Sequence, residues 1–495
     1  MFEFVNQSCA STDILILSIP FVDTHSPLCA GASLKSIAER ARFSCSVVDL
    51  NILTVRFING QKERNKFLDF FNSGYIHPTI QPLIGQYTND VVSLVKRYNP
   101  KILGLSVFSF DSRAFAVRLC KEIKNKYPDI QIMLGGAGLT DTSSDDPNFA
   151  ENLQKEQLID HFIKGDAEHS FYEFLTGNKT YPGVNQSNWI QLKRNDLAVL
   201  PYPNYDDYYW NWYDPALPID NHELKNVNTN NVAIPITGSR GCVRNCKFCD
   251  FIVSHKQFTW RTAENIFDEM IHQSKRYGIT MFGFTDSLVN GNMKEYRQLM
   301  TMLAEYNNLQ PFDKRIQWVG QFIMRPETQF KEDLWELTAR AGATQLFIGI
   351  ETIDDKVRYD MGKAFTNKDI DFGLSMMKKY NINAYLMFAI GYVSETQEVH
   401  DRWPQWLQQR VEYKDNITIG IMGTMEIPKD TYLDLHHEQL GIVWSGKKAM
   451  SNWATADNKN TFDKRNEWAK LAYQHVVDFG FNGDSNRIPH HQKDL

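Results

Sequence analysis

The chain has 495 residues, of which 42% are hydrophobic and 23% charged, so a folded protein of several domains is expected. Its formal net charge of −6 gives no support to a nucleic-acid partner, and a small molecule or a peptide is expected as substrate instead. The odd count of seven scattered cysteines argues against a disulfide framework, and the apolar run Ile14 to Pro20 is too short to span a membrane, so we expect a cytoplasmic protein without a membrane partner.

Residues 1–180 alternate between short apolar runs and segments with helical spacing. Residues 13–19 form a continuous apolar run, typical of a strand buried on both faces of a parallel sheet. Further strands are expected at 46–51, 102–107, 130–134 and 159–163, and helices at 30–43, 89–97, 112–127 and 170–175. This order predicts an α/β domain with a doubly wound, Rossmann-like sheet. The stretch 54–88 fits neither pattern and is interpreted as an insertion.

Residues 181–231 are expected to connect two domains. Six aromatic residues gather near the middle of this segment: Tyr205, Tyr208, Tyr209, Trp210, Trp212 and Tyr213. Such a cluster can stack on a planar ligand or bury a linker between domains, and the linker is the favoured interpretation.

Residues 232–433 repeat a strand and helix pattern six times. Strands are expected at 232–237, 280–284, 316–319, 345–350, 383–390 and 417–421, and helices at 263–277, 293–306, 331–341, 367–380 and 397–411. Six units are too few to close an eight-stranded barrel, so the pattern predicts a partial (β/α)6 barrel with its site at the carboxyl ends of the strands. Residues 434–495 are expected to form a small C-terminal segment with a helix at 466–479.

The first strand of this barrel leads into a loop with three cysteines, Cys242, Cys246 and Cys249. Structural zinc sites and ferredoxin-type clusters take four protein ligands, so three thiolates leave one metal position open for another molecule. The alternatives are a closed zinc site completed by His255, in a metal-binding or redox-sensing protein without catalysis, and three cysteines close together by chance.

The spacing CxxxCxxC, with the aromatic Phe248 before the last cysteine, resembles the signature of the radical SAM superfamily. The resemblance implies a 4Fe-4S cluster on the three cysteines and S-adenosylmethionine (SAM) on the open iron. It also implies reductive cleavage of SAM to a 5'-deoxyadenosyl radical, with an electron donor such as flavodoxin or ferredoxin. Strand-end stretches that match the superfamily add Asp286, Arg325 and Glu351 to Phe248 as cofactor-binding residues.

Residues 1–180 resemble the cobalamin-binding domain that precedes the radical SAM core in one large class. The matching stretches are Leu103 to Ser106, Met133 to Gly136, Gly165 to Glu168 and Leu200 to Pro203, and the resemblance assigns Ser106, Gly135 and Gly136 to the cofactor. There are two departures. Gly138 stands where that class often has histidine, and the stretch Asp23 to His25 lacks the glycine of a cobalt-binding motif. Cobalamin without a protein cobalt ligand, or a domain that has lost the cofactor, both stay open.

The resemblance predicts a radical SAM enzyme that alkylates, most often methylates, a small molecule or a peptide with the help of cobalamin. Rearrangement, cyclisation or oxidation without cobalamin is the alternative within the superfamily. A methylthiotransferase is disfavoured because the N-terminal half has no second three-cysteine motif. No residue is assigned to the chemical step, and the substrate is not identified.

Overall fold

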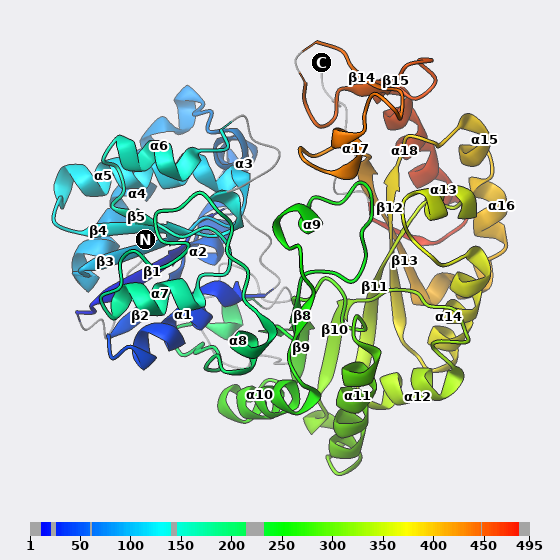
Figure 1. Ribbon diagram of the computed structural model, residues 1–495, viewed down its shortest axis with the longest axis horizontal. Helices are drawn as coiled ribbons and strands as arrows, with labels where there is room; N and C mark the ends of the chain where they lie inside the picture. Colours follow the sequence, from blue (N-terminus) through cyan, green and yellow to red (C-terminus); the bar gives the residue numbers. More distant parts are fainter. Residues whose placement is uncertain are drawn as a thin grey trace. The chain divides into compact units, whose positions relative to one another are not determined.

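The computed structural model describes residues 11–20, 26–59, 62–139, 146–213, 232–446 and 448–484 (Figure 1). The chain divides into two compact units, Met1–Pro235 and Ile236–Leu495. Among the helices within the described ranges, none combines the length and the apolar composition that a membrane crossing requires. His25 and its neighbours from residue 21 lie outside the described residues.

The first unit contains a five-stranded sheet in the order β2-β1-β3-β4-β5, and every pairing in it is parallel. Its strands are β1 (Ile14–Ser18), β2 (Cys45–Asp49), β3 (Ile102–Ser106), β4 (Gln131–Gly135) and β5 (His161–Phe162). Its helices are α1 (Cys29–Arg40), α2 (Leu50–Asn59), α3 (Arg64–Ser73), α4 (Gln81–Tyr98), α5 (Arg113–Lys126), α6 (Phe149–Lys155), α7 (Glu168–Leu175) and α8 (Arg194–Ala198). This strand order is that of a doubly wound sheet, so the predicted fold class is confirmed.

The stretch 54–88, interpreted above as an insertion, is helical. It holds most of α2, all of α3 and the start of α4, and its aromatic residues Phe67, Phe71 and Tyr87 are buried in the core of the first unit. Pro82 lies in the first turn of α4, where the missing N–H of proline breaks no helical hydrogen bond. This proline therefore marks the start of a helix.

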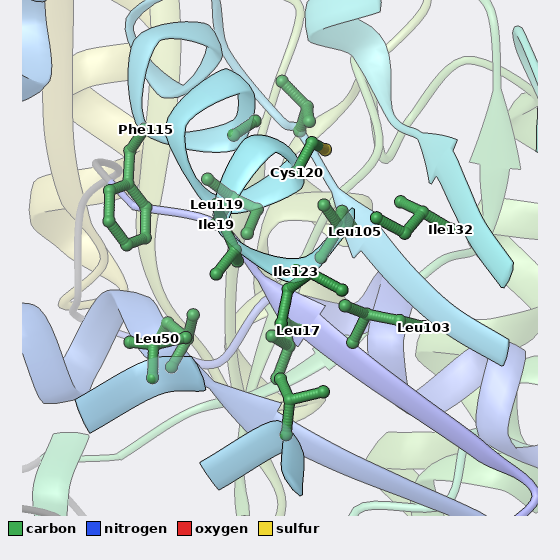
Figure 2. Close-up of a cluster of buried hydrophobic side chains, with 14 of the residues drawn as sticks. Leu17, Ile19, Leu50, Leu103, Leu105, Phe115, Leu119, Cys120, Ile123 and Ile132 are labelled. Atoms are coloured by element: carbon green, nitrogen blue, oxygen red, sulfur yellow. The ribbon is translucent and has the colours of Figure 1, made fainter. Parts of the chain in front are cut away.

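The core of the first unit forms where α5 packs on the sheet (Figure 2). Phe115, Leu119 and Ile123 lie four residues apart on one side of the helix and are fully buried. They face apolar side chains of the neighbouring strands, among them Leu103 and Leu105 of β3. The apolar residues at helical spacing on α5 thus pack against the alternating apolar residues of β3 in one layer of the core.

The aromatic segment packs within the first unit. The hydroxyl of Tyr205 donates to the carbonyl oxygen of Pro235 at 3.1 Å, and the hydroxyl of Tyr213 donates to a carboxylate oxygen of Asp49 at 2.6 Å. Both rings are buried, so these residues fix the chain that leads toward the second unit.

The second unit contains a seven-stranded sheet in the order β16-β13-β12-β11-β10-β9-β6. Its strands are β6 (Ile234–Ile236, across the boundary of the units), β9 (Met281–Phe284), β10 (Gln317–Gln321), β11 (Ala343–Glu351), β12 (Asn383–Ile390), β13 (Ile417–Thr424) and β16 (Asn482–Asp484). Helices α11 (Met293–Asn308), α12 (Glu332–Arg340) and α14 (Asn367–Lys379) lie along its outer side (Figure 1). The predicted partial barrel of six strand and helix units is confirmed.

The remaining elements of this unit flank the sheet. Two pairs of short strands are antiparallel, β7 (Ser239–Arg240) with β8 (Thr259–Trp260) and β14 (Ile442–Trp444) with β15 (Trp453–Thr455). The other helices are α9 (Phe251–Ser254), α10 (Ala263–Tyr277), α13 (Asp355–Asp360), α15 (Gln397–His400), α16 (Trp403–Gln408), α17 (Tyr432–Leu435) and α18 (Phe462–Asp478). The helix predicted at 397–411 is two helices, because Pro404 starts α16 and cannot continue α15.

The C-terminal segment is part of the barrel sheet. β16 pairs in parallel with β13, where Thr418 stands opposite Asn482. A strand of three residues is too short to show an alternating pattern, so the sequence analysis did not detect it.

Candidate functional site

The cysteine loop, residues 241–258, follows the carboxyl end of β6 and is closed at its base by the pairing of β7 with β8. Gly241 begins the loop with φ +84°, and a Cβ atom there would lie 2.1 Å from the carbonyl oxygen of Gln257. Only glycine fits, because L-residues rarely adopt this conformation and the space beside it is filled. The two ends of the loop are therefore held together by its own backbone.

The three thiols of the loop are free and half-buried. The N–H of Arg244 donates to Cys242 Sγ at 3.4 Å, and the N–H of Cys249 donates to the carbonyl oxygen of Cys246 at 3.1 Å. Burial raises the pKa of the Cys246 thiol, and it raises the pKa of Cys249 to about 11 against the opposing N–H of Phe251. Both thiols carry their protons at neutral pH, so binding of iron as thiolates releases protons.

These thiols share one loop but are not preassembled around a metal position. No group of three or more His, Cys, Asp or Glu side chains in the described part of the chain is arranged to hold a metal ion. His255, considered above as a zinc ligand, stacks on Phe251 with ring centroids 4.4 Å apart, and burial with the Arg240 charge lowers its pKa to about 4. A cysteine side chain turns about one bond, so three thiols on one loop fit a cluster that gathers them on binding.

A turn at residues 360–363, between α13 and α14, lies against the cysteine loop. The N–H of Lys247 donates to the carbonyl oxygen of Met361 at 3.0 Å. Gly362 has φ +91°, and a Cβ atom there would lie 3.5 Å from Cys246 Cα. The backbone of this turn therefore supports the middle of the loop, next to its second cysteine.

Glu351, at the carboxyl end of β11, has φ +66°, which is unusual for a residue other than glycine. Its Oε1 lies 2.7 Å from Nζ of Lys363, on the turn just described, and both side chains are largely buried. The charges of Lys363 and Glu351 act in opposite directions on the pKa of Cys246, so this ion pair lies beside the cysteine loop. The structure thus brings the predicted Glu351 and the predicted cysteines together.

Asp286, which follows β9, is buried and engaged inside the protein. One carboxylate oxygen accepts from the N–H of Gly238 at 2.8 Å, and the other accepts from the Ser239 hydroxyl at 2.5 Å. Burial raises the pKa of Asp286 to about 6, against the effects of these hydrogen bonds and of the Arg261 charge. Asp286 therefore braces the chain between β6 and β7, just before the cysteine loop.

Arg325 follows β10 and donates from Nη2 to the carbonyl oxygen of Asn290 at 2.9 Å. Its Nε is buried and has no hydrogen-bond partner among the residues that the structure describes. Burial and the neighbouring charge of Arg244 lower the pKa of Arg325. A guanidinium group with a free donor suits an anionic ligand group.

Phe248 is half-buried within the cysteine loop.

In the first unit, Ser106 at the end of β3 stands opposite Gly135 at the end of β4. Gly136 follows with φ +108°, and a Cβ atom there would lie 2.3 Å from the carbonyl oxygen of Val107. The hydroxyl of Ser18, at the end of β1, is buried and has no hydrogen-bond partner within the described residues. The strand order reverses between β1 and β3, where open α/β sheets bind ligands. The unpartnered Ser18 hydroxyl at this position can donate a hydrogen bond to a polar cofactor such as cobalamin.

Comparison with protein families matches residues 236–401 to the radical SAM superfamily. These residues form a radical SAM domain. It contains the cysteine loop, Asp286, Arg325, Glu351 and the supporting turn. Lys363 was not predicted as a site residue, because a lone lysine carries no signal of its partner. Ser18 was not predicted either, because a lone serine in an apolar strand carries no signal that its hydroxyl lacks a partner.

Two curated relatives match about two thirds of this chain at low identity. An uncharacterized methyltransferase of Pyrococcus horikoshii is 22% identical over 324 residues, 63% of this chain and 64% of that protein. The anaerobic magnesium-protoporphyrin IX monomethyl ester cyclase of a Synechocystis strain is 20% identical over 341 residues, 68% of this chain and 64% of that protein. The chain thus spans less than two thirds of the length of each.

A solved structure matches both units. It is the radical S-adenosylmethionine methyltransferase TsrM of Kitasatospora setae with cobalamin and a [4Fe-4S] cluster bound. The TM-score is 0.62 at 15% sequence identity, and the match covers 96% of this chain and 93% of that one. At this identity the likeness shows a shared fold.

Proposed function

We propose that the chain is a radical SAM enzyme whose three loop cysteines, Cys242, Cys246 and Cys249, hold a 4Fe-4S cluster. The observation that carries the proposal is three thiols in one loop at the carboxyl edge of a radical SAM domain. His255, the fourth zinc ligand considered above, stacks on Phe251 instead, which favours an open cluster over the closed zinc site.

Each charged group at the strand ends has a proposed task. Glu351 accepts hydrogen bonds from SAM with its carboxylate, and Arg325 binds an anionic group of SAM with its free donor. Asp286 holds Gly238 and Ser239, and through them the start of the cysteine loop. Phe248 packs inside that loop. A 4Fe-4S cluster held by the three cysteines, once reduced by an external electron donor, would supply the electron that cleaves SAM to methionine and a 5'-deoxyadenosyl radical.

We further propose that the first unit binds cobalamin at Ser106, Gly135 and Gly136, and that the reaction is methylation of a small molecule or a peptide. Support comes from the fold shared with TsrM, solved with cobalamin, and from the curated relative named a methyltransferase. An electron donor such as flavodoxin or ferredoxin is required, and we place the protein in the cytoplasm, where thiols stay reduced.

Anaerobic reconstitution with iron and sulfide tests the radical SAM proposal. The wild type is expected to gain broad visible absorbance and to release 5'-deoxyadenosine from SAM when reduced. Cys246→Ala is expected to lose both signals, whereas the matched control Cys29→Ala, outside the loop, retains them. A colourless protein with stoichiometric zinc and no SAM cleavage would refute the proposal.

Ring formation or oxidation without cobalamin is the second candidate, favoured by the relative that is named a cyclase. Mass spectrometry of small molecules extracted from protein purified without oxygen separates the two. Cobalamin in near-stoichiometric amount supports methylation, and its absence from a fully cluster-loaded sample refutes that mechanism.

A further inference from the structure

Glu351 has a strained backbone that requires an explanation. Its φ of +66° lies in the left-handed region, where Cβ crowds the neighbouring carbonyl group. The pairing of β11 with β12 shifts register between Gly349 and Glu351, so the strand is distorted at this residue. Strain of this kind persists only where the surroundings hold it in place, and it gathers at functional sites.

Lys363 is the side chain that holds this distortion. Its Nζ lies 2.7 Å from the carbonyl oxygen of Gly349 and 2.7 Å from Oε1 of Glu351, so one ammonium group bridges the irregular end of the strand. A Cβ atom on Gly349 would lie 2.4 Å from Glu351 Oε1 and 2.7 Å from Lys363 Nζ. The ion pair of Lys363 with Glu351 therefore occupies the space where a side chain at position 349 would lie.

Contacts between the cysteine loop and the turn at residues 360–363 help to fix the position of Lys363. Its own N–H donates to the carbonyl oxygen of Arg358 at 3.1 Å, which closes the turn after α13. The same turn accepts the N–H of Lys247 and places Gly362 against Cys246. One short segment thus contacts both the loop that holds the cluster ligands and the carboxylate at the end of β11.

The ion pair leaves half of the carboxylate available. Oε1 of Glu351 accepts from Lys363, and no hydrogen bond to Oε2 is found within the described residues. Because the ammonium bonds both to a fixed carbonyl and to one oxygen, it also fixes the direction in which the other oxygen points.

We propose that Lys363 is a positioning residue of the SAM site. It holds Glu351 in its left-handed conformation by bonding to one carboxylate oxygen, so that the other oxygen can contact SAM. Through its turn it also fixes the position of that carboxylate relative to the cysteine loop. This role rests on the proposed function, in which Glu351 contacts SAM.

A double-mutant cycle on cluster-loaded protein tests the role, with the Kd for SAM measured by anaerobic equilibrium dialysis without turnover. Lys363→Met is expected to weaken SAM binding about tenfold or more, as loss of supporting partners does at metal sites. In a Glu351→Ala background, which removes the acceptor of Lys363, the same change is expected to cost less than threefold, because Lys363 acts through Glu351. Lys363→Arg keeps the charge and is expected to recover part of the loss.

Iron content per chain is measured for every variant, because a change in cluster loading would imitate a change in SAM affinity. The matched control is Lys379→Met, which breaks the exposed pair of Lys379 with Glu332 and is expected to leave the Kd unchanged. Should Lys363→Met fail to fold, Lys363→Gln takes its place, since an amide can still donate to Gly349.

Two outcomes overturn the positioning role alone. In one, Lys363→Met binds SAM as tightly as the wild type. In the other, it costs the same factor with Glu351 present and with Ala in its place. Failure of cluster-loaded wild type to bind SAM at all would instead overturn the proposed function, and this role with it.

Discussion

The two units reach the same kind of backbone conformation at their strand ends by different means. After β4 in the first unit, the positive φ of +108° belongs to Gly136, which accepts it without steric strain. At the end of β11 in the second unit, a φ of +66° belongs to Glu351, whose Cβ makes that conformation costly. The first unit uses the conformation for close packing of main chain. The second retains a charged side chain there and adds Lys363 to hold it.

The largest expected effect tests the packing side of this comparison. Gly136→Ala places a Cβ atom 2.3 Å from the carbonyl oxygen of Val107 at a φ that L-residues avoid, so we expect a loss of about 2 to 4 kcal/mol in unfolding free energy. The measurement is urea unfolding followed by circular dichroism. Gly177→Ala is the matched control, because Gly177 has φ +107° but no atom within 4 Å of its Cβ position. Equal losses in the two variants would show that φ alone matters.

Each unit also has a buried carboxyl group near the end of a strand. Asp49 ends β2 in the first unit, Asp286 follows β9 in the second, and burial raises the pKa of both. For Asp286 the folded pKa of about 6 exceeds the ordinary value of 3.8, so its contribution to stability is full below pH 3.8 and is lost as pH rises through 6. Relative to the wild type, Asp286→Asn is therefore expected to gain about 2 kcal/mol between pH 4 and pH 7.

Chemical unfolding of the wild type and Asp286→Asn across this pH range measures the gain. Asp13→Asn is the control that is expected to show almost no change over this range, because hydrogen bonds from Ser44 and Lys101 lower the pKa of Asp13 to about 2. Its difference from the wild type is expected to change only below pH 4. A constant difference for Asp286→Asn would mean that the carboxyl group keeps an ordinary pKa in the folded protein.

The smallest expected effect separates strain from function at Glu351. Glu351→Gly relieves the left-handed strain, and Glu351→Ala does not, so the glycine variant is expected to be more stable by about 1 kcal/mol although both lose the contact with Lys363. Thermal unfolding of the two variants side by side measures the difference. Both are expected to bind SAM more weakly than the wild type. An alanine variant as stable as the glycine variant would mean that the backbone relaxes when the glutamate is gone.

Sequence periodicity predicted the fold well where segments were long. The helix at 263–277 and the strand at 383–390 have the predicted bounds, because an apolar face repeats over several turns or pairs. The prediction failed for short or interrupted elements. β16 has three residues, β7 and β8 have two each, and Pro82 hid the start of α4.

The candidate site was only partly readable. The cysteines share one loop, so their spacing alone placed them together, and Glu351 was indicated by its place at a strand end. Lys363, twelve residues along the chain, carries no pattern that names its partner. Asp286 was correctly placed at a strand end, but its two hydrogen bonds inside the protein follow from a neighbouring strand that the sequence does not specify.

The sequence by itself determined the α/β architecture, with one parallel sheet following another along the chain. It also determined the presence of three thiols that leave one metal position open for a further ligand. These depend on local spacing, which the chain displays directly. Only the tertiary structure decided which charges meet, which glycines are obligatory and where the backbone is strained. Such features depend on contacts between segments far apart in the chain, and their energies come from distances that no linear pattern contains.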